Sequence, residues 1–202
     1  RDTALGIAPA PIESRIRRAV RVILPTYAIL TGALALLLSA AGQGALEATV
    51  HAMAILSTSG ISPHQEGLAA GRSFTAEAIA ALFLLTAATR LFYSGASAFG
   101  SRRALGRDPE LWMLLALVAF ISATLFLRHW VGALTIDLGG EVISAFDALW
   151  GIVFTVLSFL TTTGFASGFW DSARDWSGLA NPGLILLGRA AIGGGAAPAA
   201  GG

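Results

Sequence analysis

Two short stretches determine how this chain is interpreted: LSTSGI at residues 56–61 and LTTTGF at residues 160–165. They align when Gly60 is placed over Gly164, an offset of 104 residues. Each stretch puts hydroxyl side chains and a glycine directly after a run of apolar residues. One such match arises easily by chance, so the flanking segments decide whether the chain contains a repeat.

The flanking segments match at the same offset. Apolar stretches of helical character precede the two motifs, at residues 45–56 and 147–160. The apolar segment that begins at Thr75 lies over the one that begins at Leu179. We therefore expect an internal repeat, in which each unit consists of a span, a short helix, a Ser/Thr/Gly loop and a second span.

The composition is that of a membrane protein. Hydrophobic residues make up 55% of the 202 residues and charged residues only 12%, against roughly 25% charged in a typical soluble domain. All 13 basic residues are arginine and the net charge is +1, which does not favour a nucleic-acid partner. With no cysteine and three scattered histidines, we expect no metalloenzyme, no other enzyme activity and no cofactor on this chain.

The membrane segments follow from length, since a spanning helix needs about 20 apolar residues. Residues 45–56 are too short to cross and are more typical of a re-entrant helix. The expected organisation is a basic cytoplasmic segment (1–21), a first unit (22–99, with pore helix 45–56 and loop 57–62), a cytoplasmic linker (100–110), and a second unit (111–202, with pore helix 147–160 and loop 161–167).

The arginines set the expected orientation, because cytoplasmic flanks of spans carry an excess of basic residues. They gather before the first span and between the second and third spans: Arg15, Arg17, Arg18, Arg21, Arg102, Arg103 and Arg107. The segments that hold the two loops are acidic instead. Both loops should therefore enter from the outer face, as in a parallel repeat around a pore, whereas an inverted repeat would place them on opposite faces.

The two loops are candidates for binding a cation. Irregular backbone at membrane depth is tolerated only inside protein or beside water, and the C-terminal end of a short helix carries a partial negative charge. Gly60 and Gly164 permit strained conformations that turn carbonyl groups toward an axis, and nearby hydroxyls such as Ser57 and Thr161 would add ligands or pin the loop. The expected ion-binding residues, acting through backbone carbonyls, are Thr58, Ser59, Gly60, Ile61, Thr162, Thr163, Gly164 and Phe165.

A plainer interpretation remains open for each loop. Glycine at the first position beyond a helix is a common C-cap, so each motif would simply end an ordinary short helix. Two other functions also remain open: a non-conducting membrane scaffold, and a secondary transporter of another substrate with broken helices.

The two motifs resemble the second and third selectivity-filter loops of the Trk/Ktr/HKT superfamily of potassium transporters, although Ile61 stands where that family usually has Phe. A glycine-rich stretch resembles the intramembrane gate of the same family: Gly193, Gly194, Gly195, Gly201 and Gly202. The resemblance implies an all-α membrane protein with four pseudo-fourfold helix–pore loop–helix units, of which this chain holds the second and most of the third.

The same resemblance implies K+ uptake across the cytoplasmic (inner) membrane, a multi-pass protein surrounded by lipid, a homodimer, and gating by a cytosolic nucleotide-binding ring. Three further expectations concern single residues. Asp147 would cap the second pore helix, and Glu47 and His51 would pair on one helix face. Arg189 is an intramembrane charge, and it is either a functional candidate that faces a cavity or part of a terminal stretch that is not native.

Overall fold

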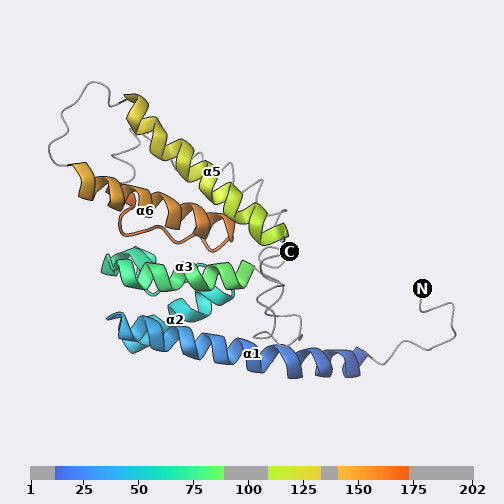
Figure 1. The fold of residues 1–202 in the computed structure, drawn as a ribbon. Coiled ribbons are helices and arrows are strands. Elements are labelled where there is room, and N and C mark those ends of the chain that lie inside the picture. Colours follow the sequence, from blue (N-terminus) through green and yellow to red (C-terminus); the bar gives the residue numbers. More distant parts are fainter. Residues whose placement is uncertain (1–11, 89–108, 133–140, 173–202) are drawn as a thin grey trace, which may run out of the picture.

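The computed structural model describes residues 12–88, 109–132 and 141–172, and every regular element in these ranges is helical (Figure 1). The all-α prediction is confirmed for this part of the chain. The elements are α1 (Ile12–Ala40), α2 (Ala45–Leu56), the 3₁₀ helix η2 (Gly67–Gly71), α3 (Phe74–Ala88), α5 (Pro109–Gly132) and α6 (Glu141–Leu160).

One helix in the described ranges, α1, is long and apolar enough to cross a membrane, through its segment Ile23–Ala40. The other apolar helices are shorter by this measure: Ala45–Leu56, Phe74–Thr86, Leu111–Leu127 and Ala145–Leu160. α1 already begins at Ile12, so the predicted cytoplasmic segment is partly helical. The end of the second predicted span lies outside the described residues.

The chain reverses direction after α1 at Gly42. Gly42 has φ +101°, a left-handed conformation that glycine adopts without a steric penalty. Two reverse-turn hydrogen bonds close the helix end, from Gly42 N to Ser39 O (3.0 Å) and from Gln43 N to Leu38 O (3.1 Å). This pair of bonds is a Schellman motif with glycine at its usual position, and it delivers the chain to the start of α2.

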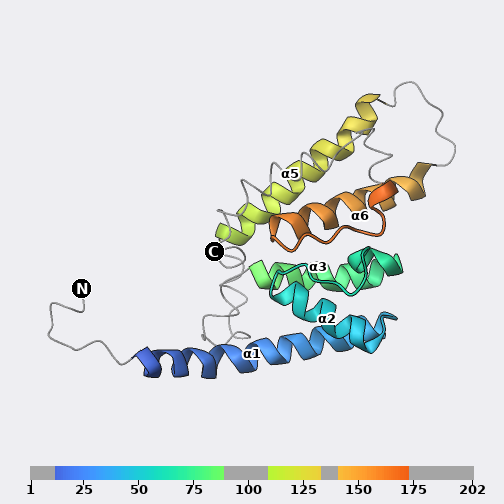
Figure 2. The ribbon, with the colours of Figure 1, turned by 180° about the vertical axis from the view of Figure 1, so that it is seen from behind.

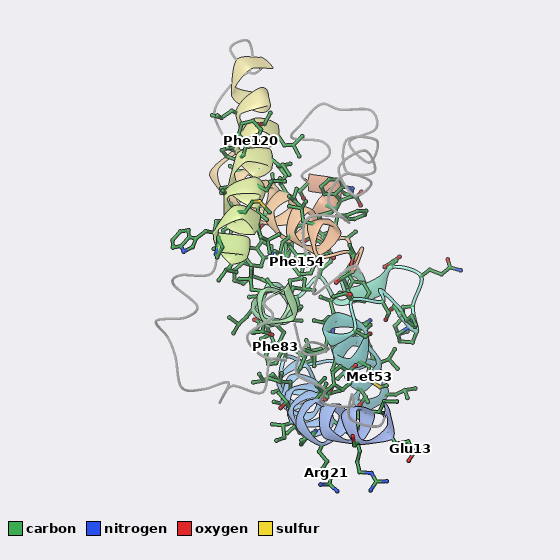
Figure 3. The ribbon with its side chains drawn as sticks, turned by 90° about the vertical axis from the view of Figure 1, so that its right-hand side faces the viewer. Glu13, Arg21, Met53, Phe83, Phe120 and Phe154 are labelled. Atoms are coloured by element: carbon green, nitrogen blue, oxygen red, sulfur yellow. The ribbon has the colours of Figure 1, made fainter. Side chains whose placement is uncertain are left out.

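The helices pack in sequence across the molecule. α1 contacts α2 and α3, α3 contacts α6, and α6 contacts α5. In the view of Figure 3 these elements follow one another, with Phe83 on α3 and Phe154 on α6 near the middle. The fully buried Ala48 and Ala52 keep α2 thin on its packed face, which lets helix backbones approach closely.

α1 and α5 end on the same side of the molecule, where α2 and α6 begin (Figures 1 and 2). The chain after α2 and the chain after α6 both return toward that side. Both loops therefore run back toward the side on which α2 and α6 begin.

The start of α6 corrects one expectation. α6 begins at Glu141, so Asp147 lies inside the helix and does not cap it. The expected pore helix began at residue 147, but Val142, Ile143 and Phe146 continue the apolar pattern of α6 toward its start at helical spacing. A glutamate at the start of a helix is also favoured by the helix dipole.

Large apolar side chains remain exposed along α1 and α5, among them Leu24, Ile29, Leu36, Phe120 and Leu127. Soluble monomers rarely expose apolar patches larger than a few hundred Å². On α1 they lie in the segment Ile23–Ala40, which is long and apolar enough to cross a membrane.

Candidate functional site: the loops after α2 and α6

The first loop (residues 57–62) begins with a tight reversal at the end of α2. Ser57 is still right-handed, with φ −88°, and Thr58 is left-handed, with φ +50°. Three backbone N–H groups of the loop donate to carbonyls of the last turn of α2. The bonds run from Ser57 to Met53 (3.0 Å), from Thr58 to Ile55 (3.3 Å) and from Ser59 to Ala54 (2.9 Å).

The second loop (residues 161–167) repeats this backbone at the 104-residue offset. Thr162 has φ +62° and Gly164 has φ +81°, matching Thr58 and Gly60, which has φ +66°. The same three N–H groups donate to the equivalent carbonyls of α6. The bonds run from Thr161 to Leu157 (3.0 Å), from Thr162 to Phe159 (3.1 Å) and from Thr163 to Ser158 (2.9 Å).

The side-chain hydroxyls of the two loops also match. Ser57 Oγ donates to Met53 O (2.7 Å), and Thr161 Oγ1 donates to Leu157 O (3.0 Å) at the equivalent place. A second hydroxyl contact recurs as well, between Ser57 and Ser59 (3.1 Å) and between Thr161 and Thr163 (3.4 Å). These hydroxyls were expected either to bind the ion or to pin the loop to its helix. The hydroxyl of the first residue of each loop does the second.

The helix ends differ from an ordinary glycine C-cap. Both are Schellman motifs, but the left-handed position beyond the helix is Thr58 or Thr162, and the glycine comes two residues later. A left-handed β-branched residue is a genuine outlier, costing on the order of 1–3 kcal/mol, and such strain clusters at functional sites. The interpretation of each motif as an ordinary C-cap therefore placed the glycine at the wrong position, because Thr58 and Thr162 occupy the position beyond the helix.

The two loops touch each other. A Cβ atom built on Gly60 would overlap the carbonyl oxygen of Thr163. Phe165, only 4% exposed, lies edge-on to the ring of His51, with ring centroids 5.7 Å apart, and against Gly67. The predicted ion-binding residues of the two loops are thus brought together, although they are 104 residues apart in sequence.

The two positions after the glycines have different surroundings. Phe165 of the second loop is buried against the first unit, whereas Ile61 of the first loop is 65% exposed.

Among the described residues, none donates to a carbonyl oxygen of residues 59–61 or 163–165. The loop N–H groups that form the two Schellman motifs are used within their own helices. The result is a pair of adjacent segments that offer acceptor oxygens, beside helix C-termini that carry partial negative charge.

His51 of α2 contacts the last residue of the first loop. It is fully buried, and its ring nitrogens lie 3.1 Å from Gln43 Oε1 and 2.9 Å from Ser62 Oγ. The predicted Glu47–His51 pair is replaced by this bridge, and Glu47 instead lies 4.0 Å from His64. His51 therefore links the start of α2 to the end of the first loop.

We predict that His51→Phe, which keeps a ring but removes both hydrogen bonds, destabilises the protein. Gln43 and Ser62 would lose their partner, at a cost of about 1–3 kcal/mol. A lower melting temperature in detergent is the expected result. His64→Phe, at an exposed position, is the control and should melt close to the wild type; equal melting of both variants would contradict a bracing role for His51.

Glu77 of α3 is a contact residue that we did not anticipate from the sequence. Its carboxylate is fully buried and accepts bonds from Trp150 Nε1 (2.8 Å), Ser167 Oγ (2.6 Å) and Gly168 N (2.7 Å). A carboxylate inside a predicted apolar span is a signal that points to such a role. The partners could not be inferred, because they lie 73 to 91 residues away in sequence.

The glycine-rich stretch with Gly193, Gly194, Gly195, Gly201 and Gly202 lies outside the described residues, as does Arg189. Comparisons with protein-family models, with curated proteins and with solved structures found no match to this chain. What the two loops do is therefore inferred from their geometry.

Proposed function

We propose that this chain is part of a pore that takes up a monovalent cation, K+ in preference to Na+, across the cytoplasmic membrane. The observation that carries the proposal is the pair of adjacent loops whose carbonyl oxygens at residues 59–61 and 163–165 accept no hydrogen bond from described residues. Rings of such carbonyls replace the hydration shell of K+ in selectivity filters. A scaffold that used these loops only for packing would be expected to satisfy its carbonyls internally.

Three further observations support the same function. The loops approach from one side (Figures 1 and 2), they share a strained backbone conformation, and each directly follows a helix C-terminus. A parallel arrangement around an axis needs the first of these, and cation binding is favoured by the last. No bond is made or broken in this process, so the proposed function is not enzymatic.

The proposal includes further units. The chain supplies two of the four loops that a closed filter needs, and the exposed Ile61 side chain faces where a preceding unit would pack. As the resemblance implies, the complete transporter would be a multi-pass inner-membrane homodimer, gated by the glycine-rich stretch and by a cytosolic nucleotide-binding ring.

Gly164→Ala tests this function. Apart from the two neighbouring residues, no atom of the described part of the chain lies within 4 Å of the added methyl group. The substitution therefore acts through the backbone, since φ +81° is unfavourable for alanine. The strain is about 1–2 kcal/mol, and it is relieved by moving the carbonyls that would bind the ion. We expect the ratio of K+ to Na+ uptake to fall about tenfold in cells that lack their own K+ uptake.

Gly71→Ala is the matched control, because Gly71 also has open space around it and no positive φ is recorded there. That variant should transport like the wild type. Unchanged transport and selectivity in Gly164→Ala would count against a filter at this loop.

A further inference from the structure

The buried carboxylate of Glu77 connects the two units of the chain. Glu77 lies in the first turn of α3, which belongs to the first unit, and its relative exposure is 0%. All three of its hydrogen-bond donors belong to the second unit: Trp150 on α6, Ser167 at the end of the second loop, and Gly168 directly after that loop.

The helix that carries Glu77 is firmly anchored at this end. Ser73 caps α3, with its Oγ accepting from Ala76 N (3.3 Å) and its carbonyl accepting from Glu77 N (3.1 Å). A carboxylate in the first helical turn is also stabilised by the helix dipole. The capping bonds of α3 therefore fix the backbone that carries Glu77, independently of its contacts with the second loop.

The second loop is held by α6 at two further points. Phe165 N donates to Ser158 Oγ (2.7 Å), and Ser167 N donates to Thr155 Oγ1 (3.1 Å). Glu77 adds hydrogen bonds from the first unit to residues 167 and 168. Among the described residues, no other side chain of the first unit forms a hydrogen bond with these two residues. The carbonyls of residues 163–165 lie between the helix end and these anchors.

The backbone around Gly168 shows that the fit is close. A Cβ built on Gly168 would lie 2.9 Å from Arg72 Cα and 3.1 Å from Ala69 O. The segment before α3 thus packs against the same point that Glu77 holds by hydrogen bonds. Small movements of Glu77 are transmitted to the loop, because there is no space to absorb them.

We propose that Glu77 is a positioning residue for ion selection: a carboxylate of the first unit that fixes the carbonyls of the second loop at the spacing that K+ requires. This inference rests on the proposed function. The chemistry calls for a carboxylate, because an ionised carboxylate only accepts hydrogen bonds and so suits three donors. Glutamine has nearly the same shape but would turn its NH₂ group toward at least one of those donors.

Glu77→Gln tests the proposal in the complete transporter, with K+ and Na+ uptake measured at equal amounts of protein in the membrane. We expect the ratio of K+ to Na+ uptake to fall about tenfold, since hydrogen bonds to a charged group are among the strong ones. Glu66→Gln removes the same charge from an exposed residue without a side-chain cap bond, and its ratio should change less than about twofold.

Two further variants separate positioning from simple loss of charge. Ser167→Ala and Trp150→Phe each remove one donor and leave the carboxylate in place. Both should lower the selectivity ratio in the same direction as Glu77→Gln, and the double variant Glu77→Gln/Ser167→Ala should lose less than the product of the single effects. These two variants also keep the test decisive if Glu77→Gln does not reach the membrane.

The outcomes distinguish this inference from the proposed function. If the wild type carries no K+, the proposed function fails. If the wild type selects K+ and both Ser167→Ala and Trp150→Phe keep its ratio, the positioning role of Glu77 is overturned while the pore remains. A fall in total uptake with an unchanged ratio would show that Glu77 serves folding only, and would equally overturn the proposal.

Discussion

Gly60→Ala is expected to disrupt the contact between the two loops and to abolish K+ uptake. The added methyl group would overlap the carbonyl oxygen of Thr163, a backbone atom that cannot rotate away. It would also force alanine into a left-handed conformation, because Gly60 has φ +66°. Overpacking and backbone strain together should cost roughly 3 kcal/mol or more.

The measurement is thermal unfolding in detergent, combined with uptake in cells that lack their own K+ transporters. Gly32→Ala is the control, since nothing lies within 4 Å of its added methyl and Gly32 lies inside α1. Alanine is the better helix former by roughly 0.5–1 kcal/mol, so this control should be as stable as the wild type or more so. Normal melting and uptake of Gly60→Ala would mean that the two loops do not meet as described.

Phe165→Ala is expected to cost about 3–5 kcal/mol of stability, the usual loss for a buried Phe that leaves a cavity. The ring fills the space between His51 and Gly67 of the first unit and is 4% exposed. Its removal withdraws the main apolar contact between the second loop and the first unit. Both the melting temperature and K+ uptake should fall.

Phe120→Ala is the matched control, with the same change on an outward-facing part of α5 where the ring is 64% exposed (Figure 3). It should shift the melting temperature only slightly. If the two variants melted alike, Phe165 would not be a structural contact between the units.

The positions of the two loops could be predicted because their signals are local. A short apolar helix that ends in hydroxyl residues and glycine specifies its own C-terminal hydrogen bonds, which is why residues 57–62 and 161–167 leave their helices where expected. The offset of 104 residues then relates one loop to the other without any knowledge of their contact.

The conformational preference of glycine predicted the wrong residue for the left-handed position at the ends of α2 and α6. Glycine is the usual residue at that position of a Schellman motif, and Gly42 occupies it after α1. At the ends of α2 and α6 the position falls to Thr58 and Thr162, where pinning by hydroxyls and packing against the other loop outweigh the intrinsic preference. Tertiary contacts of this kind are not encoded in a local pattern.

The partners of His51 and Glu77 illustrate the same difficulty at longer range. His51 was expected to pair within its helix, four residues from Glu47, but it bridges Gln43 and Ser62. The Glu77 carboxylate bonds to residues 73 to 91 positions away. Spacing within one helix predicts its own face well, but it says nothing about which later segment will pack there.

The hydrogen bond between Glu77 and Gly168 also has a consequence for synthesis of the protein. The two residues are 91 positions apart, and ribosomes add about 5–20 residues per second, so the carboxylate waits roughly 5–20 seconds for its donor. When that interval begins, the Glu77 carboxylate has none of its three donors, since Trp150, Ser167 and Gly168 all come later in the chain. The contacts of this carboxylate can therefore be completed only after the chain has been synthesised through Gly168.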